Sequence, residues 1–245
     1  MAVYVLLGRG IMRSLTGLSR EVVFAILNLL GVYFFLFYGH RVHYADRFGL
    51  YVGLIVFQYL TLWLFSESKD WKFWLAFFTP IGAFIIVRYL PGLLSAKLGH
   101  ANSGEMLELV GISYLAFRTS RLALEVRNDV VKKPGFWEYL NFSFFLPTMP
   151  VGPINTYANY RRGFEPIPWE IPIGRCALRI LVGFVKFQFL GVLCNQLTYS
   201  GLLMDDHPHL SIDLPIAILF FYLYLYCNFS GFCDMAIGAA GLIGI

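Results

Sequence analysis

Three polar residues lie inside strongly apolar stretches of this sequence and are the side chains best suited to chemistry. Lys186 interrupts the apolar run 176–204, and Ser230 and Asp234 follow the aromatic run 220–226. Ionisable groups at membrane depth are costly, so they mark cavities, substrate paths or contacts between helices. An ammonium, a hydroxyl and a carboxylate could hold a polar substrate or move a proton. The residues alone leave open whether Asp234 serves such a site or only ties helices together.

The spacing of these residues predicts which of them act together. Arg175, Arg179 and Lys186 follow one another at intervals of four and seven, which places them on one helix face. We expect the two arginines to extend toward lipid headgroups and the deeper Lys186 to be functional. Ser230 precedes Asp234 by one helical turn and is expected to hydrogen-bond it. A carboxylate held in this way stays ionised, so we predict that Asp234 supports a site without acting as its base.

An uncharged segment at residues 139–160 is the second unusual feature. Pro147, Pro150 and Pro153 lie in it together with Gly152, and prolines there remove amide donors and prevent a continuous helix. Backbone groups freed at membrane depth must be buried in protein or line a water-filled cavity. A broken, buried segment is therefore expected, and an ordinary proline-kinked span is the alternative. The residues predicted to line a channel or substrate path are Pro147, Pro150, Gly152, Pro153, Asn155, Lys186, Asn228, Ser230 and Asp234.

Composition predicts the protein class. Of the 245 residues, 58% are hydrophobic, 18% aromatic and only 14% charged, which is typical of a polytopic, all-α membrane helix bundle. The net charge of +4 is explained by loops that face anionic lipid, so no nucleic-acid partner is expected. The four cysteines show neither Cys-x-x-Cys nor histidine spacing typical of metal sites. We therefore expect free thiols and no bound metal.

Six apolar runs approach the roughly 20 residues that a helix needs to cross a bilayer. They occupy residues 22–39, 48–66, 71–89, 106–124, 176–204 and 214–233. The run 106–124 contains Glu108, Arg118 and Arg121, so it should face protein where it crosses. Its last turn, with Arg121 and Glu125 at i,i+4, should emerge into water.

Charge asymmetry predicts the orientation in the cell membrane. The loops on one predicted side, including those before residue 139 and after residue 160, carry most of the Lys and Arg residues, whereas the turn with Asp205 and Asp206 carries none. The positive side is cytoplasmic in this reading, and so is the N-terminus. Because both flanks of residues 139–160 then lie on one side, this segment should re-enter and return.

Three blocks of sequence occur in the order seen in one membrane family. They are Gly111-Ile-Ser-Tyr114, then Phe145-Leu-Pro-Thr-Met-Pro-Val-Gly-Pro-Ile154 with Tyr157, and Tyr226-Cys-Asn-Phe-Ser-Gly-Phe-Cys-Asp-Met-Ala-Ile-Gly238. With them the chain resembles the membrane-bound O-acyltransferase family, and most of all its bacterial branch of alginate O-acetylation and teichoic acid D-alanylation proteins. The resemblance covers residues 111–245. Residues 1–110 match only as N-terminal transmembrane helices.

The resemblance implies a helix bundle with a funnel from the cytoplasm that meets an outer vestibule. An acyl thioester, from acetyl-CoA or an acyl carrier protein, would enter from the cytoplasm as the donor substrate, and no bound cofactor is implied. A hydroxyl of an extracytoplasmic polymer would accept the acyl group. Membrane lipid, the donor or its carrier, and the polymer are the implied partners.

One departure from the family pattern concerns the base. In the family, the last block is followed by a tryptophan- and arginine-rich segment and then by the membrane histidine regarded as catalytic. The histidines of this chain lie in predicted loops outside the matching blocks: His40, His43, His100, His207 and His209. We therefore expect the catalytic histidine beyond Ile245, on a further segment or a downstream polypeptide, and no transfer by these 245 residues alone. A non-catalytic membrane partner or transporter-like protein is the alternative, although the paired short segments of transporters are not evident.

Overall fold

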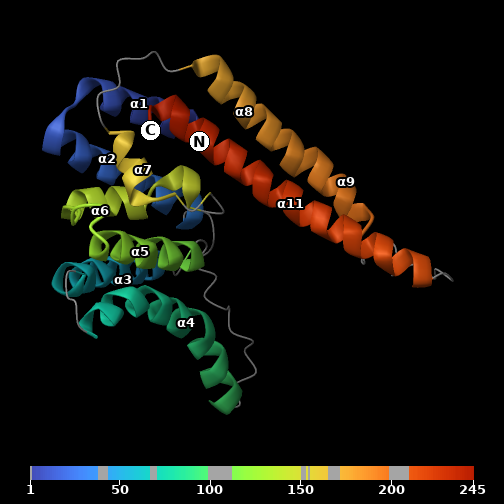
Figure 1. The fold of residues 1–245 in the computed structure, drawn as a ribbon, viewed down its shortest axis with the longest axis horizontal. Helices are drawn as coiled ribbons and strands as arrows, with labels where there is room; N and C mark the ends of the chain where they lie inside the picture. The colour runs from blue at the N-terminus through green and yellow to red at the C-terminus, as the bar shows by residue number, and fades with distance from the viewer. Residues whose placement is uncertain are drawn as a thin grey trace. The chain divides into compact units, whose positions relative to one another are not determined.

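The computed structural model describes residues 2–37, 44–66, 71–98, 112–149, 153, 155–164, 172–198 and 210–245. All regular elements in these ranges are helical, which confirms the predicted all-α class (Figure 1). They are α1 (Ala2–Ser14), α2 (Gly17–Val32), the π-helical η1 (Tyr33–Phe37), α3 (Tyr44–Phe65), α4 (Lys72–Leu98), α5 (Ile112–Arg127), α6 (Phe136–Ser143), the 3-10 turn η2 (Leu146–Thr148), α7 (Tyr157–Arg162), α8 (Ile173–Val185), the π-helical η3 (Lys186–Leu190), α9 (Gly191–Gln196) and α11 (Leu210–Ile243).

Three helical stretches are long and apolar enough to cross a membrane. They are Gly17–Phe35, Ile173–Gln196 and Ser211–Ile243, and shorter apolar helices occupy Tyr51–Phe65 and Lys72–Ile86. The last stretch exceeds the predicted span 214–233, because the small residues that follow continue the helix. Large apolar side chains of the later stretches, such as Leu178 and Leu181, are 60% exposed, as expected for lipid contact. The chain is a membrane protein.

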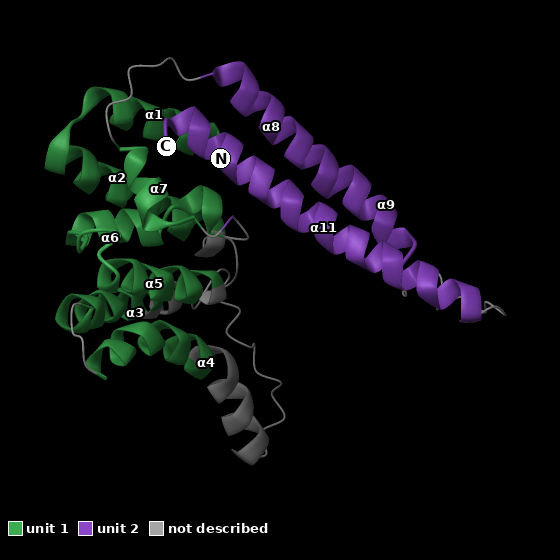
Figure 2. Ribbon diagram, in the orientation of Figure 1, with its two compact units in different colours: residues 1–150, 154–167 green, residues 151–153, 168–245 purple. Residues whose placement is uncertain are grey.

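The described chain forms two compact units (Figure 2). Unit 1 comprises residues 1–150 and 154–167, and unit 2 comprises residues 151–153 and 168–245. The boundary predicted from the motifs, between residues 110 and 111, lies outside the described residues and stays a prediction.

Unit 1 is built around buried aromatic rings and one polar network. Phe24 and Tyr51 are among its fully buried side chains. Asn28, also fully buried, accepts a hydrogen bond from the Tyr4 hydroxyl and donates one to Asn141 Oδ1 over 3.2 Å. Asn141 in turn donates to a backbone carbonyl of α2. Paired polar side chains of this kind join apolar helices at fixed positions, here α1, α2 and α6.

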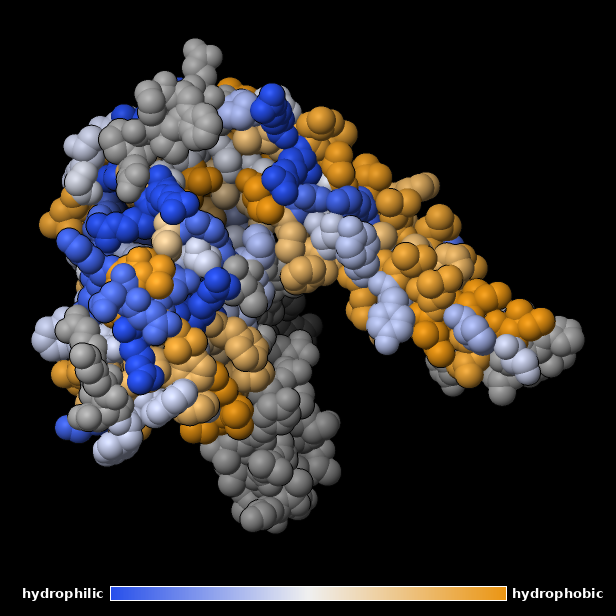
Figure 3. Space-filling model, viewed as in Figure 1, coloured by the Kyte–Doolittle hydropathy of each residue, from blue (hydrophilic) through white to orange (hydrophobic). Residues whose placement is uncertain are grey.

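Unit 2 is an antiparallel hairpin in which the helical run α8–η3–α9 packs along α11. The contacts run in opposite directions along the two arms: Gly183 lies against Gly231, and the later Gly191 against the earlier Asn228. Figure 3 shows hydrophobic side chains along much of this hairpin and hydrophilic ones gathered near the start of α8. This distribution fits an element that crosses lipid and reaches a polar interface at one end.

Candidate functional site

The proline-containing segment is broken and buried, as predicted. Helix α6 ends at Ser143, the short turn η2 holds Pro147, and α7 does not begin until Tyr157. All residues from Tyr139 to Met149 are buried. Pro153 and Asn155 are half-buried and precede α7. Two further predicted lining residues, Pro150 and Gly152, lie outside the described residues.

The two ends of this segment meet. Arg161 Nη1 donates to Glu138 Oε2 over 3.2 Å, and the Tyr157 hydroxyl donates to the same oxygen over 2.9 Å. Burial lowers the pKa of Arg161, but the negative charge of Glu138 outweighs this and raises it, so the guanidinium remains charged. A segment whose flanks are joined turns back on itself, as re-entry requires. The side of the membrane from which it enters stays a prediction.

Glu125 has a different role from the one predicted. Its ion pair with Arg121 at i,i+4 is present, at 3.2 Å. The Glu125 side chain is only 11% exposed, however, and its other oxygen accepts the backbone N–H of Tyr157 over 3.0 Å. Together with Thr156, which accepts from the Asn159 N–H, it satisfies the free amides at the start of α7. Arg121 is exposed, whereas Glu125 is buried against α7; whether this turn emerges into water stays a prediction.

Arg118 faces protein, as predicted for its segment, and it also contacts the broken segment. Its side chain is buried, donates to Thr148 Oγ1 over 2.8 Å and lies 4.1 Å from the centre of the Phe142 ring. Within the described residues, Nε and Nη2 have no hydrogen-bond partner. No pattern within the segment 106–124 predicts this contact, because its partner lies across the fold.

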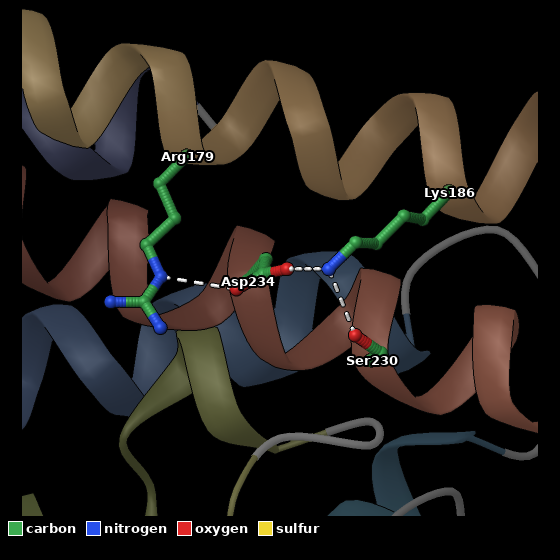
Figure 4. A network of polar contacts seen from close by, with 4 residues as sticks. All are labelled: Arg179, Lys186, Ser230 and Asp234. Atoms are coloured by element: carbon green, nitrogen blue, oxygen red, sulfur yellow. Dashed lines mark hydrogen bonds and ion pairs between the residues drawn. The ribbon is translucent and has the colours of Figure 1, made fainter.

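The predicted polar residues of unit 2 come together in one network (Figure 4). Lys186 Nζ donates to Asp234 Oδ2 over 2.6 Å and to Ser230 Oγ over 3.0 Å. Arg179 Nε donates to the second carboxylate oxygen, Oδ1, over 3.1 Å. Arg179 and Lys186 thus reach from one arm of the hairpin to a single carboxylate on the other, whose side chain is 16% exposed.

Backbone geometry positions this network. Lys186 opens the π-helical turn η3, a wider turn that is frequent at functional sites. One turn earlier, Gly183 lets the helices approach so closely that a Cβ built on it would lie 2.6 Å from the Gly231 carbonyl oxygen. Gly238 is packed in the same way against the backbone at Cys176. Small residues on both arms therefore bring the two helix backbones into close contact.

The network also corrects two details of the sequence reading. Ser230 was expected to hydrogen-bond Asp234, but its hydroxyl accepts from Lys186 instead. Arg179 was expected to extend to the headgroups, whereas it pairs with Asp234. Asn228 lies at the helix contact, with its Oδ1 3.4 Å from a Cβ built on Gly191. The unit 1 residues Pro147 and Asn155 are not part of this network.

The arrangement is suited to holding charge at a fixed place. Lys186 and Asp234 form an ion pair at hydrogen-bonding distance, and Arg179 adds a second cation. The supporting role of Asp234 stays a prediction. A fixed ammonium can donate hydrogen bonds to a carbonyl oxygen that gains negative charge.

The remaining reactive side chains offer no second centre in the described ranges. All five histidines lie outside them. The four cysteines are free, and no group of three or more potential metal ligands occurs among the described residues.

Comparison with known proteins found relatives of one kind. The chain is 23% identical to a teichoic acid D-alanyltransferase of Lacticaseibacillus rhamnosus, over 91% of this chain and 62% of the relative. It is 24% identical to the teichoic acid D-alanyltransferase of Streptococcus thermophilus, over 99% of this chain and 60% of the relative. It is 25% identical to that of Bacillus subtilis, over 95% of this chain and 53% of the relative. No family model matches the chain. It spans somewhat more than half the length of these curated relatives.

Proposed function

We propose that this chain works in a membrane O-acyltransferase that moves an acyl group from a cytoplasmic thioester to a hydroxyl of an extracytoplasmic polymer. The observation that carries the proposal is the match to three teichoic acid D-alanyltransferases over nearly the whole chain. The position of Asp234 adds support. It lies in the most specific family-like block, and two cations from the facing helix hold it.

In the proposed reaction, the acceptor hydroxyl attacks the thioester carbonyl carbon. A new C–O bond forms, the C–S bond breaks, the hydroxyl proton goes to a base and the donor leaves as a thiol. The described residues supply no such base, so their proposed part is to bind and orient the reactants. We assign to Lys186 the role of a hydrogen-bond donor, either to the thioester carbonyl oxygen or to the substrate on its path to that position. Asp234 and Arg179 would hold the Lys186 ammonium in place.

Transfer by membranes tests the proposal. Membranes from cells with the intact gene and from cells in which it is deleted are incubated with cell-wall polymer and a labelled acyl thioester. We expect the intact membranes alone to place label on the polymer, in a form that mild base releases, as an ester requires. Equal ester-linked label in both membranes would refute the proposal.

A further inference from the structure

Two cysteines face each other across the unit 2 hairpin, near the end of its first arm. The register of the antiparallel arms follows from the contact of Gly191 with Asn228. Cys194 comes three residues after Gly191 and lies on α9, and Cys227 directly precedes Asn228 on α11. Residues three apart share a helix face, so this register brings the two cysteine side chains together.

Burial and direct contact agree with this pairing. Cys227 is 9% exposed, whereas its neighbours Tyr226 and Phe229 are 65% and 53% exposed, so its side chain points toward the facing arm. The helices packed along this part of α11 are η3 and α9. The thiol of Cys227 lies within hydrogen-bonding range of the thiol of Cys194. Both thiols are free, and Cys194 is half-buried.

The spacing of the two arms suits a disulfide. A disulfide requires two Cα atoms about 4.4–6.8 Å apart. Small residues allow helix backbones in a membrane to approach closely. A Cβ built on Gly183 would lie only 2.6 Å from the carbonyl oxygen of Gly231, which follows Cys227 by one turn of α11. The backbones are therefore in direct contact next to the facing thiols.

The other two cysteines of unit 2 form an internal control. The Cys176 sulfur would lie 2.7 Å from a Cβ built on Gly241, which is two turns beyond Cys233 along α11. Two helical turns extend about 11 Å, which is farther than a disulfide reaches. Cys176 and Cys233 therefore do not face each other across the hairpin.

We propose that Cys194 and Cys227 are a modification site, at which a small, membrane-permeant hypohalous acid forms a reversible disulfide. Cys194 lies close to the end of the apolar stretch Ile173–Gln196. The chain next reaches the turn with Asp205 and Asp206, which charge asymmetry predicts to be extracytoplasmic. The outside of the cell is the oxidising compartment. This inference does not depend on the proposed acyl transfer.

The oxidation balances in atoms and electrons. The sulfur of the half-buried Cys194 attacks the halogen of the hypohalous acid; an S–halogen bond forms, the O–halogen bond breaks, and the thiol proton leaves with hydroxide as water. The Cys227 sulfur then attacks the Cys194 sulfur. An S–S bond forms, the S–halogen bond breaks, and halide leaves together with the second thiol proton. The two sulfurs lose two electrons and the halogen gains two, and an added dithiol reverses the link by exchange.

The disulfide would fix the two arms next to the polar network. Cys194 follows the π-helical turn η3, which Lys186 opens. Ser230, which accepts from Lys186, lies one turn after Cys227. The link also closes the loop 194–227 and so restricts the unfolded chain. The oxidised chain should therefore withstand a higher fraction of denaturing detergent than the reduced chain.

Peptide mapping of the full chain in nanodiscs tests the proposal. The reduced chain is treated with equimolar hypochlorous acid, the remaining thiols are blocked with N-ethylmaleimide, and the denatured chain is digested for mass spectrometry. We expect the linked peptides to join Cys194 with Cys227 and to disappear after dithiothreitol. Links to Cys176 or Cys233 in equal yield would overturn the proposal. Oxidation of Cys194 to a sulfinic acid without any link would overturn it as well.

Oxidation of the denatured chain separates the effect of the hairpin from chance pairing. In an unfolded chain the shortest loop closes most readily, and it joins Cys227 with Cys233. We therefore expect denaturation before oxidation to move the link from Cys194 to Cys233. An unchanged yield of the Cys194–Cys227 link in the denatured chain would refute the role of the hairpin.

Two double variants extend the test to stability. Replacing Cys176 and Cys233 with serine leaves the facing pair, and replacing Cys194 and Cys227 leaves the control pair. The first variant should lose both free thiols on oxidation and then survive pulse proteolysis at a higher denaturing-detergent fraction. The second should form no internal link and show no such shift. Equal behaviour of the two variants would overturn the proposal, and the peptide map of the unmodified chain decides it where a variant does not fold.

Discussion

Replacing Gly183 with alanine should push the two arms of the unit 2 hairpin apart. The added Cβ would lie 2.6 Å from the Gly231 carbonyl oxygen and 2.9 Å from both the backbone nitrogen and Cγ of Met235. Ordinary carbon–oxygen contacts are about 3.3–3.6 Å. Two of the three opposing atoms belong to the backbone of α11, so no side-chain rotation relieves the clash.

The size of the effect follows from comparison with Gly174→Ala. Gly174 lies in the same helix, and a Cβ built on it meets no atom within 4 Å. Both substitutions gain the higher helix propensity of alanine, at most about 1 kcal/mol. Only Gly183→Ala also overpacks an interface, which typically costs about 1–3 kcal/mol. Its free energy of unfolding should therefore be lower than that of Gly174→Ala by about 1–3 kcal/mol.

Pulse proteolysis in mixed detergent micelles measures this difference at a series of denaturing-detergent fractions. The unmodified chain serves as the reference, and the two alanine variants are compared at the same lipid and detergent composition. Equal unfolding free energies for the two variants would refute the close helix contact, and with it the positioning of Lys186 one turn away.

Three further predictions concern single sites. Asp234→Asn should lower acyl transfer by about tenfold or less, because the amide oxygen still accepts from Lys186, whereas Asp234→Leu should lower both transfer and the amount of chain in the membrane. Complete loss of transfer in Asp234→Asn at normal abundance would instead make Asp234 part of the proton transfer. Arg118→Met should leave the unfolding free energy unchanged or raise it by up to about 4 kcal/mol, because an apolar side chain replaces a buried cation of which two nitrogens have no partner among the described residues; a clear decrease would show that the charge is needed. Single cysteines in place of Glu138 and Arg161 should react with impermeant reagents from the cytoplasmic side only, and labelling from opposite sides would contradict re-entry.

Features that depend on local spacing could be predicted from the sequence. Helical periodicity placed Arg179 and Lys186 on one face, and the prolines predicted the break between α6 and α7. Charge asymmetry further predicted that residues 139–160 return to the side of the membrane from which they enter. The contact between Glu138 and Arg161, which flank this segment, is compatible with that prediction. The first two follow from neighbours within a few turns of the chain, and the third from the charge of its loops.

Features that depend on how helices cross could not be predicted. Asp234 takes its partners from a helix 48 and 55 residues earlier in the chain, and no local rule selects that pairing over the nearby Ser230. The π-helical turn at Lys186 likewise leaves no clear periodic signal in so short a stretch. The cavity of about 230 Å³ lined by Glu21, Glu138 and Arg161 forms only because α2, α6 and α7 pack together, so its residues carry no common motif.

The ester-linked acyl content of the cell-surface polymer tests the central claim most directly. It is measured in cells whose only copy of the gene carries either Lys186→Met or Arg175→Met, with the chain quantified in the membrane. Arg175 is the matched control, since it lies on the same helix and does not belong to the network of Lys186 and Asp234 in the described part of the chain. The account predicts a large loss of ester in Lys186→Met at normal chain abundance and none in Arg175→Met. Unchanged ester content in Lys186→Met would contradict it.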